Sequence, residues 1–164
     1  MFGSDVSSVA TWSPGPVAPP ARASAARPLV IAHRGASGYR PEHTLESYRV
    51  AIALGADYVE PDLVVTADGV LVARHENEIG GTTDVASHQE FAARRTTKMI
   101  DGVSVTGWFT EDFTFAELQT LRARERLPLV RPANTAFDGQ FKVPSFQQVI
   151  DLARRSRTCD GRPV

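Results

Sequence analysis

The sequence has little of three things that mark whole classes of protein: cysteine, aromatic side chains and charge of one sign. It holds a single cysteine, Cys159, among its 164 residues, which excludes an intramolecular disulfide and a thiolate metal cluster. Only 8% of the residues are aromatic, and 18 basic side chains stand against 19 acidic ones. This balance gives no electrostatic basis for binding nucleic acid or an acidic membrane surface. We therefore expect a globular protein without a nucleic-acid partner.

Long apolar runs are also missing. No segment approaches the roughly 18 apolar residues of a membrane-spanning helix, and no apolar run follows a charged start as in a secretory signal. Residues 1–28 contain five of the eleven prolines, and such a stretch buries too little apolar surface to fold. The sequence therefore predicts a disordered leader over residues 1–28 and one globular region over residues 29–164.

The globular region opens with a pattern typical of a β-strand followed by an α-helix. Residues 29–32 are all apolar and lead into His33, Arg34 and Gly35. A short apolar run without alternation is typical of a strand covered on both faces, as in parallel α/β sheets. Thr44 can then cap a helix with apolar residues at helical spacing, which Gly55 would end. We predict an α/β fold that begins with a βα unit.

A second strand is predicted over residues 57–65, and a hairpin follows it. The Asp-Gly pair at 68–69 lies between two apolar runs, which indicates a two-residue turn. The two strands must be antiparallel, because a parallel crossover needs roughly a dozen residues or more. A two-residue turn places Asp62 opposite His75, and opposed residues share a face with Cβ atoms about 5 Å apart. Glu60, Asp62 and His75 are therefore expected to converge.

The rest of the globular region is predicted to contain two helices and two loops. Residues 79–112 are polar and contain several glycines, and we interpret them as an irregular insertion outside the core. Thr114 forms a capping box with Glu117 ahead of one helix, and Ser145 caps the other. Residues 127–142 between the helices are expected to form a loop.

Four other features receive simple interpretations from the sequence. His43 and His88 are expected at the surface or in support of a site. The arginines between residues 122 and 126 are expected on a solvated helix face. Trp108 lies in the polar insertion, where it is a candidate for substrate contact.

Two carboxylates on the second predicted strand suggest a metal site. Glu60 and Asp62 are two residues apart and lie on one face of the strand, and hard oxygen ligands suit Ca²⁺ or Mg²⁺. An acidic pair on a strand is also typical of an exposed polar face. The apolar neighbours favour burial, however, and two buried carboxylates would repel each other without a cation.

Two histidines and an arginine complete the candidate site. His33 and His75 each follow an apolar strand. One such histidine is often a structural residue held by hydrogen bonds, but two can divide the base and acid roles of a hydrolysis. Arg34 offers a planar fork for phosphate oxygens, and Gly35 lets the backbone approach a ligand closely. With a cation, these residues predict cleavage of a phosphodiester.

These motifs resemble those of the glycerophosphodiester phosphodiesterases, most closely the calcium-dependent bacterial branch that acts outside the cytoplasm. The resemblance covers roughly residues 29 to 155 and rests on five segments: His33–Gly38, Pro41–Thr44, Gly55–Leu63, Thr66–His75 and Thr82–Ala86. It implies a (β/α)₈ TIM barrel and a small-molecule glycerophosphodiester as substrate, cleaved to glycerol 3-phosphate and an alcohol. It also suggests a periplasmic or secreted protein.

The resemblance implies a role for each candidate residue. His33 and His75 would be the catalytic acid/base pair. Glu60 and Asp62 would be ligands of Ca²⁺, with Mg²⁺ as the alternative ion. Arg34 would bind the phosphate, and Glu42, in the Pro-Glu segment, would shape the substrate site.

The sequence departs from the family pattern in two places. Glu76 follows the second histidine, where the family usually has Asp. The sequence also ends before the family's third metal carboxylate and a phosphate-facing lysine, and it is shorter than the about 250 residues of a typical barrel. We therefore expect a barrel truncated after its first βα units. Three interpretations stay open: a metal-dependent phosphodiesterase, a non-catalytic remnant of that domain, and another phospholipase-like phosphodiesterase with the same barrel plan.

Overall fold

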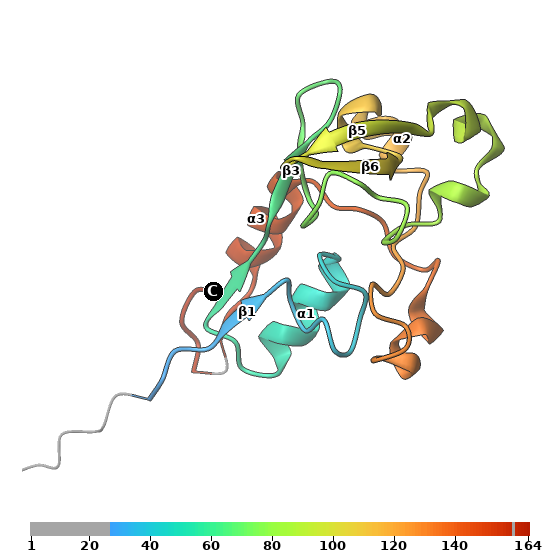
Figure 1. The fold of residues 1–164 in the computed structure, drawn as a ribbon. Helices are drawn as coiled ribbons and strands as arrows, with labels where there is room; N and C mark the ends of the chain where they lie inside the picture. The colour runs from blue at the N-terminus through green and yellow to red at the C-terminus, as the bar shows by residue number, and fades with distance from the viewer. Residues whose placement is uncertain (1–26, 159) are drawn as a thin grey trace, which may run out of the picture.

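The chain folds into short strands and helices joined by loops (Figure 1). The computed structural model describes residues 27–158 and 160–164, so the leader predicted over residues 1–28 lies outside it apart from its last two residues. In chain order the elements are β1 (Ile31–His33), α1 (Leu45–Ala53), β2 (Tyr58–Glu60), β3 (Leu63–Val65), β4 (Leu71–Ala73), the 3₁₀ helices η1 (Val85–Ser87) and η2 (Gln89–Arg94), β5 (Thr96–Ile100), β6 (Val103–Gly107), η3 (Thr110–Asp112), α2 (Phe115–Leu118), η4 (Pro132–Phe137) and α3 (Phe146–Arg155).

The predicted βα unit is confirmed. Thr44 caps α1, since its side chain accepts a hydrogen bond from the backbone N–H of Ser47. Gly55 follows the helix with a φ of +97°, a conformation that glycine adopts without steric cost. The chain then returns so that β2 pairs in parallel with β1.

Within the described residues, the β1–β2 sheet is covered on one face only. Ala32 of β1 packs against Ala51 of α1 and Ala56. Ile31 and Tyr58 are register partners on the other face, and they are 57% and 50% exposed. The prediction of a first strand buried on both faces is therefore wrong for this part of the chain, because α1 covers one face and no other described element covers the second.

The predicted second strand is two strands. β2 ends at Glu60 and β3 begins at Leu63, and Pro61 lies at the break, where its missing N–H does not interrupt a ladder. β3 then forms the predicted antiparallel hairpin with β4.

The register of this hairpin differs from the prediction by one residue. Thr66 and Val70 bond to each other through the Thr66 N–H and the Val70 carbonyl, at 3.0 Å. The loop between them therefore has three residues and closes through Gly69, whose φ is +79°. As a result Arg74 lies opposite Asp62, and its N–H donates to the Asp62 carbonyl at 3.1 Å. The prediction that His75 lies opposite Asp62 is wrong, because a slip of one residue changes which side chains share a face.

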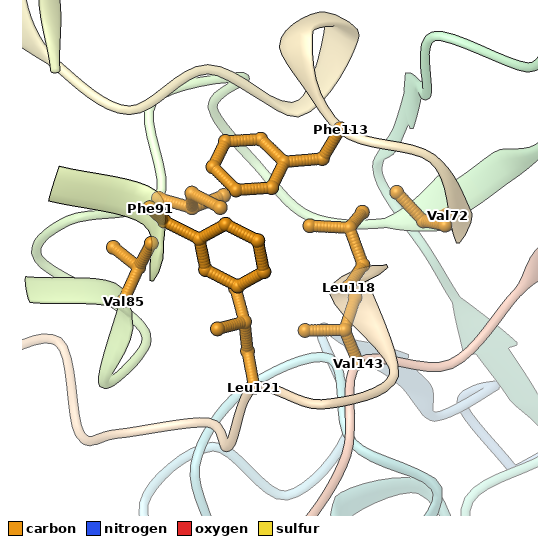
Figure 2. Packing of buried hydrophobic residues seen from close by; sticks show 8 residues of the cluster. Val72, Val85, Phe91, Phe113, Leu118, Leu121 and Val143 are labelled. Atoms are coloured by element: carbon orange, nitrogen blue, oxygen red, sulfur yellow. The ribbon is translucent and has the colours of Figure 1, made fainter. Parts of the chain in front are cut away.

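Residues 79–112 are part of the core, so the prediction of an irregular insertion outside it is also wrong. Ile79, Val85 and Phe91 belong to the largest apolar cluster (Figure 2), together with Val72, Phe113, Leu118, Leu121 and Val143. The rings of Phe91 and Phe113 meet edge to face, with centroids 5.1 Å apart. The segment therefore covers apolar surface that β4 and α2 would otherwise expose.

The same segment contains a hairpin that the sequence did not predict. β5 and β6 pair antiparallel around Asp101 and Gly102, another Asp-Gly turn. Trp108, at the end of this hairpin, donates its indole N–H to the carbonyl of Phe91 at 2.8 Å and packs against the apolar cluster. Trp108 therefore links the end of this hairpin to η2 and to the apolar cluster.

Glu78 fastens the start and the end of this segment to each other. Its Oε1 accepts hydrogen bonds from the backbone N–H groups of Gly80 and Trp108, at 2.8 and 3.2 Å. A Cβ atom at Gly80 or at Gly107 would overlap the Glu78 carboxylate. The Glu78 carboxylate therefore occupies space that is free because neither glycine has a side chain.

The two later helices begin where the sequence predicts. Thr114 and Glu117 form a capping box on α2, and Ser145 and Gln148 form one on α3. α3 packs through Val149 against Tyr48 of α1 and Ala73 of β4. Within residues 27–158 and 160–164 the strands form three two-stranded sheets and do not close a barrel, and no described helix is long and apolar enough to cross a membrane.

Two glycines with the same backbone conformation test how tightly the loop after β1 is held against α1. Gly35 and Gly69 have φ values of +80° and +79°. A Cβ at Gly35 would lie 2.5 Å from the Ser47 hydroxyl oxygen, whereas one at Gly69 meets nothing within 4 Å. We expect Gly69→Ala to lower the free energy of unfolding by about 1 kcal/mol through backbone strain, and Gly35→Ala to cost a further ~2 kcal/mol through overpacking. Urea denaturation measures both values, and equal losses would contradict the close contact.

An ion pair joins η2 to α2. The Arg94 guanidinium donates to both carboxylate oxygens of Glu117, at 2.9 and 2.5 Å. The hydrogen bonds from Arg94, followed by that from the Thr114 N–H, lower the pKa of Glu117 to about 2. The ionised carboxylate therefore stabilises the folded state above its ordinary pKa of 4.5, and this contribution is lost as the pH falls from there toward about 2.

Replacing Glu117 tests this contribution. We expect Glu117→Gln to lower the free energy of unfolding by about 1 kcal/mol at pH 7. The difference from the wild type should shrink as the pH falls from 4.5 toward about 2. Urea denaturation along a pH series measures it. Glu46→Gln is the control, since it removes only an exposed pair with Arg49. A difference between wild type and Glu117→Gln that does not change with pH would contradict the role of the charge.

Candidate functional site

His33 and Glu60 lie at the carboxyl ends of two parallel strands. They are partners in the β1–β2 register, so their side chains share a face of the sheet. This is the face that α1 leaves open, the one that also carries Ile31 and Tyr58. Proteins with parallel α/β sheets bind their ligands at the carboxyl ends of the strands, and the two side chains are placed accordingly.

Arg34 follows β1 in an unusual backbone conformation. Its φ is +63° and that of Gly35 is +80°, and left-handed residues other than glycine often mark functional sites. The Arg34 N–H donates to the Glu60 carbonyl at 2.9 Å. Its side chain, 18% exposed, lies between two carboxylates, with Nε 3.2 Å from Asp62 Oδ2 and Nη1 3.5 Å from Glu42 Oε1. The guanidinium is therefore held by Asp62 and Glu42 and lies beside His33, with Nε 3.4 Å from His33 Nε2.

His43 supports Asp62 from inside the protein. It is fully buried, with Nε2 3.1 Å from Asp62 Oδ2 and Nδ1 2.8 Å from the Tyr48 hydroxyl. Burial lowers the pKa of His43 to about 4 and raises that of Tyr48. At neutral pH the Nε2–H therefore donates to Asp62, and Nδ1 accepts from the Tyr48 O–H. Of the two sequence interpretations of His43, a supporting place fits the structure and a surface place does not.

Glu42 is buried and surrounded by arginines. Its side chain is 4% exposed, and its Oε1 accepts a hydrogen bond from Arg126 Nε at 2.8 Å. Its backbone carbonyl accepts one from Arg74 Nη1 at 3.1 Å. Arg74 is itself buried, and its Nε and Nη2 have no hydrogen-bond partner in the described part of the chain.

His75 joins this group through Glu76 and Arg126 and not through Asp62. His75 Nδ1 lies 2.5 Å from Glu76 Oε1, and both Glu76 oxygens accept hydrogen bonds from Arg126. Arg126 lies in a loop, and its side chain is 22% exposed. The predicted place on a solvated helix face is therefore wrong for Arg126.

In the described part of the chain, no third metal-binding side chain joins the two predicted ligands, Glu60 and Asp62. Across residues 27–158 and 160–164, no three His, Cys, Asp or Glu side chains gather closely enough to hold a metal ion. Asp62 uses Oδ2 for its contacts with Arg34 and His43. Glu60 is exposed, and its carboxylate has no hydrogen bond or ion pair among the described residues. The metal role of both residues stays a prediction.

Curated relatives align with most of this chain, but the aligned region is a smaller share of their own length. A glycerophosphodiester phosphodiesterase of Arabidopsis thaliana is 42% identical over 127 residues, which are 77% of this chain and 33% of the relative. One of Haemophilus influenzae is 43% identical over 144 residues, 83% of this chain and 37% of the relative. The chain thus spans little more than a third of the length of these proteins.

Solved structures share the fold over a similar extent. A glycerophosphodiester phosphodiesterase of Agrobacterium tumefaciens is 27% identical, with a TM-score of 0.53 over 77% of this chain and 42% of that one. A phosphodiesterase of Oleispira antarctica, solved in complex with the product sn-glycerol-3-phosphate, is also 27% identical, with a TM-score of 0.51 over 76% of this chain and 39% of that one.

The sequence pattern of one family covers the candidate site. The model of the glycerophosphoryl diester phosphodiesterase family matches residues 33–159, which include both histidines, both carboxylates and Arg34. This confirms the family resemblance that the motifs predict: the chain belongs to the glycerophosphoryl diester phosphodiesterase family.

Proposed function

We propose that this chain carries the acid/base and phosphate-binding part of a site that hydrolyses glycerophosphodiesters to glycerol 3-phosphate and an alcohol. The observation that carries the proposal is the placement of His33, Arg34 and Glu60 together at the carboxyl ends of β1 and β2. Family membership supports the reaction class, and the glycerol 3-phosphate in the Oleispira antarctica relative supports the substrate class.

Arg34 is suited to hold the phosphate. Its Nε and Nη1 face Asp62 and Glu42, which fixes the plane of the guanidinium before a ligand arrives. A planar guanidinium can donate two parallel hydrogen bonds to phosphate oxygens. Because the charge is positioned in advance, it can stabilise the negative charge that develops on the phosphoryl oxygens.

His33 and His75 would divide the proton transfers. One imidazole takes the proton of the attacking hydroxyl, from water or from the glycerol part of the substrate, as the new bond to phosphorus forms. The other gives a proton to the departing alkoxide as its bond to phosphorus breaks. The contact of His75 Nδ1 with Glu76 leaves Nε2 of His75 for the substrate.

The two carboxylates fit a hard cation. The Glu60 carboxylate and the Oδ1 atom of Asp62 have no hydrogen-bond partner among the described residues, and carboxylate oxygens are the ligands that Ca²⁺ and Mg²⁺ prefer. Glu60 and Asp62 would hold such an ion, which would supply positive charge beside the phosphoryl oxygens. Since Ca²⁺ takes roughly six to eight oxygens, other ligands must complete the site.

A second candidate is a domain that binds ligands without turning them over. The observation that favours it is the small donor set: among the described residues, no third His, Cys, Asp or Glu joins Glu60 and Asp62 closely enough to hold a metal ion. Such a protein would bind a cation weakly and catalyse nothing by itself.

An assay with glycerophosphocholine and Ca²⁺ distinguishes the two candidates. We expect release of glycerol 3-phosphate with a bell-shaped dependence on pH, and a loss of at least about 100-fold in His33→Ala, because a general acid or base contributes that much. His88→Ala, whose ring stacks on Phe91, is the control and should keep full activity. Turnover in the wild type no higher than in His33→Ala would overturn the catalytic proposal and support the second candidate.

Removal of the cation tests the metal role. We expect activity to be lost in excess chelator and to return with added Ca²⁺. Titration calorimetry should detect Ca²⁺ binding to the wild type and at least about 10-fold weaker binding to Glu60→Gln. Full activity in excess chelator, or identical binding by both proteins, would contradict the assignment of Glu60.

A further inference from the structure

Arg126 connects two carboxylates that lie far apart in the sequence. Its Nε donates to Glu42 Oε1 at 2.8 Å, and its Nη1 donates to Glu76 Oε1 at 2.8 Å. Nη2 contacts both acids, at 2.8 Å from Glu42 Oε1 and closely at Glu76 Oε2. Arg126 follows Glu42 by 84 residues and Glu76 by 50. One side chain therefore holds together the loop before α1 and the loop after β4.

On one side, Arg126 acts on His75 through Glu76. Burial works to raise the pKa of Glu76, but the hydrogen bonds from Arg126 and His75 outweigh it and lower the pKa to about 2. An ionised carboxylate only accepts hydrogen bonds. The nitrogen of His75 that faces it, Nδ1, must therefore carry the proton, and Nε2 is the nitrogen left for a ligand.

On the other side, Arg126 acts on Arg34 through Glu42. Glu42 Oε1, which accepts from Arg126, is also 3.5 Å from Arg34 Nη1. Arg34 in turn lies beside the first histidine, with its Nε 3.4 Å from His33 Nε2. The two histidines are thus the ends of one line of alternating charges, in the order His75, Glu76, Arg126, Glu42, Arg34 and His33.

We propose that Arg126 is a positioning residue that fixes the tautomer of His75 through Glu76 and the orientation of Arg34 through Glu42. The proposal rests on the proposed function, since it describes how both ends of the same site are held in place. Arg126 itself touches neither histidine. Its effect on the reaction would be indirect, because a small displacement of a group that transfers a proton or binds phosphate slows catalysis strongly.

The shape of the guanidinium explains why arginine suits this place. Its donors lie in one plane at fixed angles, so Nε can bond Glu42 while Nη1 and Nη2 bond Glu76. A lysine ammonium is a single point of charge on a flexible stem and cannot reproduce this fork. We therefore expect Arg126→Lys to keep the charge balance of the loop and to recover only part of the function.

Nitrogen-15 NMR of the histidine rings tests the proposal without any assay of activity. In the wild type, the ring of His75 in its neutral form should carry its proton on Nδ1. In Arg126→Ala, Glu76 is no longer held, and the His75 signals should shift toward a mixture of both tautomers. Arg124→Ala is the matched control, because Arg124 lies two residues away, its side chain is 51% exposed, and the one charged side chain it approaches within the described part of the chain is Asp138, at 3.7 Å. It should leave the His75 signals unchanged.

Each outcome decides the proposal. A wild-type His75 with its proton on Nε2 would overturn it before any variant is made. Wild-type signals for His75 in Arg126→Ala would also overturn it. If circular dichroism shows that Arg126→Ala does not fold, Arg126→Gln, which keeps much of the side-chain stem, gives the same readout.

Kinetics provide a second readout where the wild type is active. We expect Arg126→Ala to lower kcat by about 10- to 100-fold, with partial recovery in Arg126→Lys and no loss in Arg124→Ala. An Arg126→Ala enzyme with wild-type kcat would contradict the positioning role. A wild type without turnover would refute the proposed function but not the positioning role of Arg126, because the NMR measurement on His75 tests that role independently of activity.

Discussion

The carboxylate of Glu42 is almost completely buried, and a buried charge is costly unless opposite charges surround it. Here the guanidinium groups of Arg34 and Arg126 approach the carboxylate, and that of Arg74 bonds the backbone carbonyl of the same residue. These three arginines come from the end of β1, a distant loop and the end of β4. The loop that carries Glu42 is therefore the place where separate parts of the chain are drawn together around the candidate site.

The features that the sequence predicts well depend on contacts between residues close in the chain. Thr44, Thr114 and Ser145 each accept a hydrogen bond from an N–H three residues ahead, so three or four residues contain the whole signal. The same holds for the Asp-Gly turn between β3 and β4. His33 and Arg34 could be nominated for a similar reason, since they directly follow a short apolar run, and Glu60 could be nominated because it is two residues from Asp62.

The features that the sequence predicts poorly depend on distant contacts or on one residue of register. The sequence around Asp68 and Gly69 fits a two-residue loop and a three-residue loop equally well. The length of the loop decides whether Arg74 or His75 lies opposite Asp62. Residues 79–112 contain many polar residues and several glycines, and only folding shows that three of their apolar side chains, Ile79, Val85 and Phe91, complete the core. No local sequence pattern identifies Arg126, because its partners are 50 and 84 residues away.

The space shared by Glu78, Gly80 and Gly107 has a consequence for how this protein can vary. Any side chain at Gly107 would require the room that the Glu78 carboxylate fills, and loss of that carboxylate would leave the N–H groups of Gly80 and Trp108 without their acceptor. A substitution at Glu78, Gly80 or Gly107 is therefore tolerated only if the other two residues are also substituted. Among homologous sequences the three should vary as a set, so that an acidic residue three places after the second histidine accompanies glycine at the end of β6.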